Sequence, residues 1–153
     1  MAHEIDQIDR RILYVLQQDA QISMDALSER VGLSRNACWR RVRAMEDAGI
    51  IRARVALLDA DKLGCGLTVL VMIRTDQHNA DAMDALQNAV SIMPEITGAY
   101  RMTGDLDYLL RVQVADVPEY DKFYKRLIAR VALSDISASF VMEDIKDTTA
   151  LPL

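Results

Sequence analysis

Long apolar runs, basic leader segments and closely spaced cysteines are all missing from this 153-residue chain, and each absence narrows the class of protein. The longest predominantly apolar stretch, residues 67–73, has only the length of a strand, whereas a membrane-spanning helix needs about 20 apolar residues. No basic start followed by an apolar stretch indicates a signal peptide. We therefore expect a cytoplasmic protein that does not associate with a membrane.

Metal, redox and catalytic signatures are scarce as well. The two cysteines, Cys38 and Cys65, lie far apart without the spacing of metal ligands, which favours a reduced compartment. His3 and His78 are isolated, so neither a metal nor another cofactor is expected. The chain lacks the G-x-G-x-x-G, P-loop, H-E-x-x-H and C-x-x-C motifs, and no pairing of a nucleophile with a base is suggested. These absences argue against an enzyme.

The most informative segment that is present is residues 33–49, LSRNACWRRVRAMEDAG. Ser34 can cap a helix, and Gly49 can end it in a left-handed turn. Cys38, Val42 and Met45 then share one apolar face, where Cys38 is interpreted as a small core residue rather than a redox sensor. The opposite face presents polar and aromatic side chains: Arg35, Asn36, Trp39, Arg40 and Arg43. Such a helix suits the major groove of DNA, where Arg binds guanine or phosphate and Asn binds adenine.

A second short helix precedes this one. Residues 24–31 place apolar residues at helical spacing behind Ser23, Gly32 permits a sharp turn, and Leu33 can fill the gap between the helices. A longer amphipathic helix is expected over residues 6–19. These elements predict a helix-turn-helix domain over residues 1–50, in which the second helix of the pair reads DNA.

The distribution of charge favours the same interpretation. Residues 30–54 contain seven arginines and two acidic residues, although the whole chain carries a net charge of −5. Positive charge confined to one segment of an acidic protein is typical of a phosphate-binding surface. A solvated arginine face on an ordinary surface helix is the competing explanation.

The side chains along residues 34–43 receive separate roles. Four are expected to contact double-stranded DNA: Ser34, Arg35, Asn36 and Arg40. Arg43 is expected to contact a phosphate. For Arg41, a structural ion pair is the alternative to such a contact. Trp39 either lies on the sugar–phosphate backbone or packs on the first helix, and the residues alone leave both open.

From residue 50 the periodicity changes. Residues 50–58 are expected to form a strand or connector, and residues 59–66 contain turn formers, so residues 51–66 form a linker. The rest, residues 67–153, predicts strands at 67–75, 95–102, 106–115 and 136–145 and helices at 79–93 and 117–130. The order β-α-β-β-α-β is that of a ferredoxin-like domain, so the whole chain is assigned to the α+β class.

Several of these strands are apolar on both faces. Residues 69–73 run without a polar break, and two helices can cover only one face of a four-stranded sheet. We therefore expect the other face to pack against a second copy, which makes the protein at least a homodimer. Two paired reading helices on a palindromic site would also bind DNA more tightly than one.

The order and spacing of these segments resemble the leucine-responsive regulatory protein/AsnC (Lrp/AsnC) family of bacterial and archaeal regulators. The resemblance covers nearly the whole chain, including IDQIDRRILYVLQQDAQIS, RRVRAMEDAGII, GAYRMTGDLDYLLRVQV and SFVMEDIKDTTALPL. It implies a winged or simple helix-turn-helix domain, then a domain that regulates amino-acid metabolism, forms dimers through its sheets and assembles further into octamers. The Cys38-Trp39 pair and the TTALPL ending resemble the subgroup of DecR-type regulators that respond to cysteine.

The same resemblance implies a small effector, an amino acid, bound at contacts between dimers. Backbone N–H groups freed at the turn over residues 103–108 can hold a carboxylate, and Asp105 or Asp107 can hold an ammonium group. A plain hairpin turn is the alternative explanation of the Gly-Asp pair. The candidate effector residues are Tyr100, Arg101, Thr103, Gly104, Asp105, Asp107, Tyr108 and Ser137.

Two other functions remain as alternatives. The chain could be a small-ligand-binding ferredoxin-like protein without a DNA function, or a constitutive DNA-architectural protein that responds to no effector. The seven-arginine segment argues against the first alternative. Measuring DNA binding with and without amino acids distinguishes the second alternative from a regulator that responds to an effector.

Overall fold

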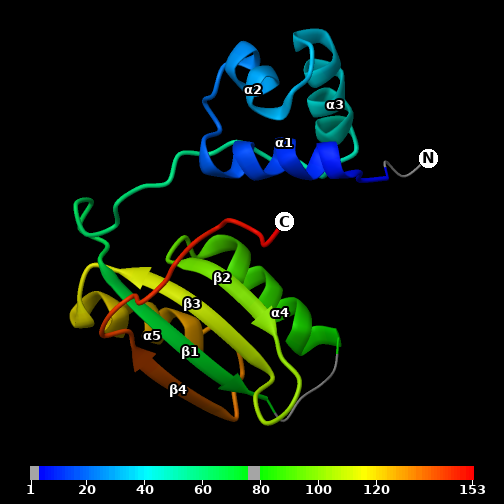
Figure 1. Ribbon diagram of the computed structural model, residues 1–153. Coiled ribbons are helices and arrows are strands. Elements are labelled where there is room, and N and C mark those ends of the chain that lie inside the picture. The colour runs from blue at the N-terminus through cyan, green and yellow to red at the C-terminus, as the bar shows by residue number, and fades with distance from the viewer. Residues whose placement is uncertain (1–3, 76–79) are drawn as a thin grey trace. The chain divides into compact units, whose positions relative to one another are not determined.

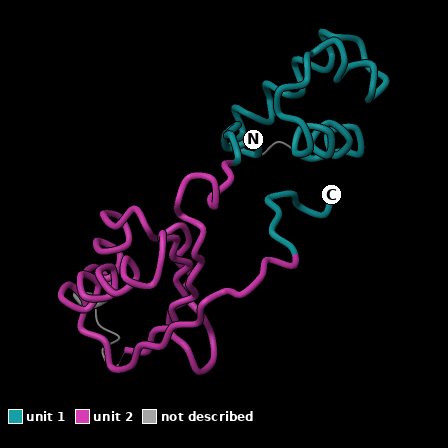
Figure 2. Tube along the Cα trace, turned by 90° about the vertical axis from the view of Figure 1, so that its left-hand side faces the viewer, with its two compact units in different colours: residues 1–57, 146–153 teal, residues 58–145 magenta. Residues whose placement is uncertain are grey.

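The computed structural model describes residues 4–75 and 80–153, which form two compact units (Figure 1). The helical unit contains residues 4–57 together with Lys146–Leu153, and the sheet unit spans Leu58–Ile145 (Figure 2). The expected division at residues 50 and 66 therefore differs from these units at the C-terminus, where the last eight residues belong with the helices. No helix among the described residues is long and apolar enough to cross a membrane.

The helical unit consists of α1 (Gln7–Gln18), α2 (Met24–Val31) and α3 (Arg35–Asp47). Each helix begins at a side chain that accepts backbone N–H bonds of the first turn, namely Asp6, Ser23 and Ser34. Gly32 and Gly49 have φ of 70° and 71°, so both adopt the left-handed conformation that ends α2 and follows α3. The three predicted helices are confirmed, and the described residues of this unit form no strand.

The core of the helical unit is apolar with one exception. Its buried apolar members are Ile12, Leu16, Leu27, Val31, Cys38, Val42 and Met45. Cys38 is fully buried, which confirms its assignment to the core. Asp9 of α1 is only 1% exposed and was not expected there from the sequence.

An ion pair network explains why a carboxylate can lie in this core. Arg41 of α3 donates from Nη1 to Asp9 Oδ1 and to Asp6 Oδ2, both at 2.8 Å. Asp6 and Asp9 also form a capping box at the start of α1. The backbone N–H of Asp9 and then the Arg41 guanidinium hold the pKa of Asp6 below its ordinary value. Of the two roles considered for Arg41, the structural ion pair is confirmed.

The segment between the units is a connector. Residues 52–59, for which a strand was the other expectation, form no strand, because a strand needs a partner and no described segment of the chain pairs with them. Arg54 attaches the beginning of the connector to the helical unit, donating to Glu46 Oε1 and to the Ala20 carbonyl. Beyond it Val55, Leu57 and Leu58 are exposed.

The sheet unit has the predicted β-α-β-β-α-β order. Its elements are β1 (Leu67–Arg74), α4 (Ala80–Ile92), β2 (Ile96–Arg101), β3 (Tyr108–Val114), α5 (Val117–Ile128) and β4 (Asp135–Phe140). The strands form one antiparallel sheet in the order β2-β3-β1-β4, and both helices cover the same face (Figure 1). The ferredoxin-like fold is therefore confirmed. Asn79, the expected start of α4, lies outside the described residues.

The fourth strand is shorter than expected. β4 ends at Phe140 rather than at residue 145, because β1 begins at Leu67 and offers no partner much beyond Val69, which lies opposite Phe140. The backbone N–H of Val141 still donates to the Thr68 carbonyl at 2.9 Å. The residues after it leave the sheet.

The two faces of the sheet differ in burial. Alternate residues of β1, Val69, Val71 and Ile73, are fully buried against the helices. The residues between them, Leu70 and Met72, are half-buried on the outer face, which neither α4 nor α5 covers. The strand is thus apolar on both faces, as its sequence indicates.

The Arg41 ion pairs can be tested by removing the charge while keeping the length of the side chain. Arg41→Met is expected to lower the free energy of unfolding of the helical unit by about 2 kcal/mol, because the buried Asp9 carboxylate loses the guanidinium while the arginine itself is partly solvated. Trp39, the only tryptophan, lies in α3 and reports on this unit in urea titrations followed by fluorescence. Arg40→Met is the matched control, and equal unfolding midpoints for the two variants would contradict the assignment.

The two thiols are expected to differ in reactivity. Burial raises the pKa of the Cys38 thiol, whereas Cys65 is exposed. Because the thiolate is the reactive form, a disulfide reagent at pH 8 should modify one thiol quickly in the folded protein. Cys65→Ser should remove this fast phase and Cys38→Ser should keep it. A fast phase that survives in Cys65→Ser would show that Cys38 is accessible.

Candidate nucleic-acid interface and effector site

The predicted DNA-contacting side chains lie together on one exposed surface of α3 and its cap. We call this surface the reading face, and all its members are exposed: Ser34, Arg35, Asn36, Trp39, Arg40 and Arg43. The opposite side of α3 packs Cys38, Val42 and Met45 into the core. The spacing of apolar residues therefore decides which side chains α3 presents to solvent.

The arginines of the reading face differ in their ion pairs. Arg35 Nε lies 3.0 Å from Asp25 of α2, and Arg43 lies 3.7 Å from Glu46 and 3.4 Å from Asp47 on its own helix. These pairs are solvent-exposed and so contribute little to stability. Arg40 has no ion pair with any residue in the described ranges. Among the arginines of the reading face, Arg40 can therefore bind a phosphate or a base without first breaking an ion pair with a carboxylate.

The remaining members of the reading face have distinct environments. Ser34 Oγ accepts the backbone N–H of Ala37 at 3.3 Å, so its oxygen caps the helix while its hydroxyl hydrogen can point elsewhere. Trp39 is 55% exposed, so a large part of its ring is accessible to solvent. Contact with a DNA backbone thus requires no movement of the ring out of the core.

The predicted effector turn is tied to the end of β1. Asp107 Oδ2 accepts the backbone N–H of Thr75 at 2.8 Å, and the backbone N–H of Asp107 donates to the Ile73 carbonyl at 3.0 Å. Arg74 Nε donates to the Asp105 carbonyl at 2.8 Å. Gly104 has φ of 99°, a conformation that other residues rarely adopt. One carboxylate oxygen of Asp107 therefore has a structural role, whereas the Asp105 side chain is exposed.

Arg74 is a candidate that the sequence analysis missed. Its guanidinium lies beside the turn, and its position on β1 is directly opposite Asp135 of β4. Its only sequence signal is a charged residue at the end of an apolar strand, which is too common to identify a site. The structure adds a cation to a turn that otherwise offers backbone groups and carboxylates.

The other candidate effector residues are spread across the sheet. Tyr100 and Arg101 are exposed at the end of β2, next to the turn, and Thr103 is exposed within it. Tyr108 instead packs against the core of the sheet unit and lines a small cavity of about 10 Å³. Tyr108 is therefore placed to position the turn.

Ser137 and Tyr100 lie on opposite edge strands of the sheet within one copy of the chain. The strand register aligns Tyr100, Leu109, Met72 and Ser137 in one row across the sheet. Tyr100 and Ser137 occupy opposite edges of this row, and three strand spacings place them roughly 14 Å apart. A single amino acid is too short to contact both.

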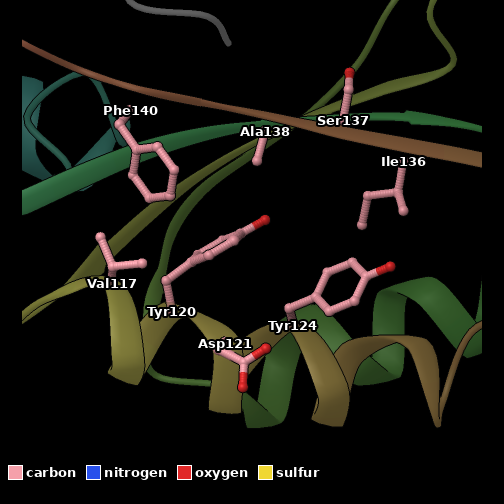
Figure 3. A pocket seen from close by; sticks show the side chains of 8 residues that line it. All are labelled: Val117, Tyr120, Asp121, Tyr124, Ile136, Ser137, Ala138 and Phe140. Carbon is pink, nitrogen blue, oxygen red and sulfur yellow. The ribbon is translucent and has the colours of Figure 1, made fainter.

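A groove beside β4 lies between this strand and α5, on the face of the sheet that the helices cover. It measures about 360 Å³ and is lined by Val117, Tyr120, Asp121, Tyr124, Ile136, Ser137, Ala138 and Phe140 (Figure 3). The side chains of Ile136, Ala138 and Phe140 point toward α5, whereas Ser137 points away from it (Figure 3). Ser137 is the predicted effector residue that lines this groove, whereas the turn residues 103–108 do not contribute to it.

Comparisons with known proteins match both units. Residues 5–52 match a winged helix-turn-helix DNA-binding domain, and residues 68–151 match the Lrp/AsnC ligand binding domain. A glutamate uptake regulatory protein of Zymomonas mobilis is 50% identical over 100% of this chain and 93% of its own. The DNA-binding transcriptional activator DecR of Escherichia coli is 49% identical over 97% of this chain and 99% of its own.

A solved structure extends the match to three dimensions. A transcriptional regulator of Neisseria meningitidis, crystallised with L-methionine, is 35% identical, with a TM-score of 0.92 over 97% of each chain. The expected resemblance to DecR is thus confirmed, and the glutamate uptake regulator matches equally well. The helix-turn-helix unit, the ferredoxin-like unit and these relatives agree, and the chain belongs to the Lrp/AsnC family of DNA-binding transcriptional regulators.

Proposed function

We propose that this protein is a sequence-specific regulator of amino-acid metabolism whose binding to DNA responds to a small effector, an amino acid. The observation that carries the proposal is the reading face, on which arginine and asparagine side chains are exposed along a capped helix. A helix of this kind enters the major groove with its N-terminal residues at the base edges. Double-stranded DNA is therefore the proposed partner.

Within the groove the side chains have different tasks. Asn36 is suited to a bidentate contact with adenine, and Arg40 to guanine or phosphate. Arg35 can also contact DNA once its ion pair with Asp25 is broken. Arg43 can do so once its ion pairs with Glu46 and Asp47 are broken. Ser34 lies at the helix N-terminus, where backbone N–H groups also favour a phosphate.

DNA binding can be tested by removing one arginine and releasing another. Arg40→Ala should weaken binding to DNA upstream of the protein's own gene about tenfold, and should lower the slope of log K against log salt by about 1 if the contact is to phosphate. Asp25→Asn should raise affinity a few-fold, because Arg35 no longer has a competing carboxylate.

Arg130→Ala, which removes the same charge from the sheet unit, is the control for a general effect of net charge. Fluorescence anisotropy at two salt concentrations measures all four proteins. Unchanged affinity of Arg40→Ala at moderate salt, with the oligomeric state preserved, would show that α3 does not dock through this face.

The proposed effector site is the turn over residues 103–107. Its exposed Asp105 carboxylate can bind an ammonium group, and Arg74 or backbone N–H groups can bind a carboxylate. These are the two ends of an amino acid. The methionine in the structure of the Neisseria regulator supports an amino-acid effector, and cysteine, leucine, methionine and glutamate are the first candidates to test.

We propose that a second copy completes this site. Ser137 and Tyr100 are too far apart in one chain to share a ligand, but residues from two dimers can converge on one. The outer face of the sheet, with Leu70, Met72 and Leu109 half-buried, suits the homodimer contact. Dimers that assemble into an octamer would place the effector turns at contacts between dimers.

The effector assignment can be tested at two neighbouring carboxylates. Asp105→Asn should abolish the rise in Tm that an amino acid produces and leave the Tm of the free protein unchanged, because this side chain is exposed. Asp107→Ala should lower the stability of the free protein by about 1 kcal/mol, because it removes the bond that ties the turn to Thr75.

Asp84→Asn, an exposed position on α4, controls for the loss of one charge. Thermal denaturation with a panel of amino acids measures both effects. An amino-acid-induced shift that persists in Asp105→Asn would refute the proposed ammonium contact. DNA binding that no amino acid changes would favour a constitutive architectural protein instead.

A further inference from the structure

The C-terminal tail is bound to the first helix by one glutamine. Gln17 near the end of α1 donates from Nε2 to the Leu151 carbonyl at 2.8 Å, and its Oε1 accepts the Leu151 backbone N–H at 2.9 Å. The side-chain amide thus pairs with both polar groups of one residue, as a neighbouring strand would. The two residues are 134 positions apart in sequence, so this contact is tertiary.

The other end of the tail is fixed on the sheet. β4 runs to Phe140, and the backbone N–H of Val141 donates to the Thr68 carbonyl at 2.9 Å. Between the two attachments Met142 is 95% exposed and Ile145 is 93% exposed. Residues 142–150 therefore form a strap that is held at its ends and solvated along much of its length.

The last turn of the strap has its own local order. Thr148 Oγ1 accepts the backbone N–H of Ala150 at 3.1 Å, directly before the residue that Gln17 holds. Such a hydroxyl–backbone bond restricts the chain to a turn. Less conformational entropy is then lost when Leu151 binds to Gln17.

These attachments give the helical unit two tethers to the sheet unit, of which the second is closed by the hydrogen bonds between Gln17 and Leu151. One is the connector around residue 57, and the other is the strap around residue 145, since Lys146–Leu153 belong to the helical unit (Figure 2). A unit attached at two points samples fewer orientations than a unit attached at one. Release of Leu151 from Gln17 would leave only the connector.

We propose that residues 148–153 are a latch that limits the freedom of the helical unit and thereby increases the affinity of a dimer for paired half-sites. The proposal rests on the proposed DNA-binding function. When one reading helix of a dimer is bound, the second binds with an effective concentration set by its tethers. The latch shortens the range that each helical unit explores, so it acts on the second binding event and not on the first.

Gln17→Ala is the sharpest variant, because it removes both the donor to the Leu151 carbonyl and the acceptor of the Leu151 N–H. Gln18→Ala is the matched control, because Gln18 is the next residue of the same helix and is exposed. A chain that ends at Asp147 removes the latch without changing α1. Circular dichroism shows whether each variant keeps its helices.

The first measurement is hydrogen exchange at the Leu151 amide, which needs no DNA. Exchange in the parent and in Gln18→Ala should be about tenfold slower than in Gln17→Ala. Equal exchange in all three would overturn the latch. This result stands whether or not the protein binds DNA, so it separates failure of the latch from failure of the proposed function.

The second measurement compares DNA carrying one half-site with DNA carrying two. Gln17→Ala and the truncated chain should bind the two-half-site DNA about tenfold more weakly than the parent and Gln18→Ala, with equal affinity for the single half-site. Unchanged affinity for both DNAs, or an equal loss on both, would overturn the role in paired binding. Failure of the parent to bind any DNA would overturn the proposed function, and hydrogen exchange would still decide whether the tail is latched.

Discussion

The orientation of α3 depends on one ion pair network, in which Arg41 bridges Asp6 and Asp9 at the start of α1. Asp9 is buried, and a buried carboxylate without a cation is costly enough to be avoided. The network therefore favours the arrangement of α1 and α3 in which Arg41 faces inward. With Arg41 inside and the apolar stripe of Cys38 and Val42 packed, the other arginines of α3 must face solvent. DNA recognition thus begins with a residue that we do not expect to touch DNA.

Nearby carboxylates compete with DNA for two of the exposed arginines. Arg35 and Arg43 have acidic partners in the free protein, whereas Arg40 has none in the described part of the chain. Phosphates must displace these carboxylates, so the pairs reduce the sequence-independent part of the affinity more than the part due to base contacts. An acidic chain with net charge −5 can in this way bind DNA without adhering to every anionic surface.

Local signals predicted most of the fold, and long-range contacts account for what they missed. Ser23, Ser34 and Gly32 mark helix ends through bonds within a few residues, so the three helices were recognisable. The end of β4 depends on where β1 begins, which no local pattern encodes. The bond between Gln17 and Leu151 joins two ordinary residues at distant positions, and the burial of Asp9 depends on an arginine 32 residues away.

The candidate sites likewise differ in how far local sequence signals could predict them. All six predicted residues of the reading face are exposed, because they lie on one helix whose apolar stripe fixes its inner side. The effector residues come from separate strands, so periodicity could not decide their neighbours. Tyr108 packs into the core, one oxygen of Asp107 holds the Thr75 backbone, and Arg74 was missed because its only signal was a charge at a strand end.

In the proposed assembly, ligand binding and association are linked. A site completed by a second copy exists only in the assembled protein, so an amino acid that fills it stabilises the assembly by RT ln(1 + [L]/Kd). Reciprocally, assembly raises the affinity for the amino acid by the same coupling free energy. The helical units are attached to the sheet units, so a change in assembly changes which pairs of reading helices can reach one DNA molecule. An effector bound to the sheet unit can therefore alter DNA binding without changing any side chain of the reading face.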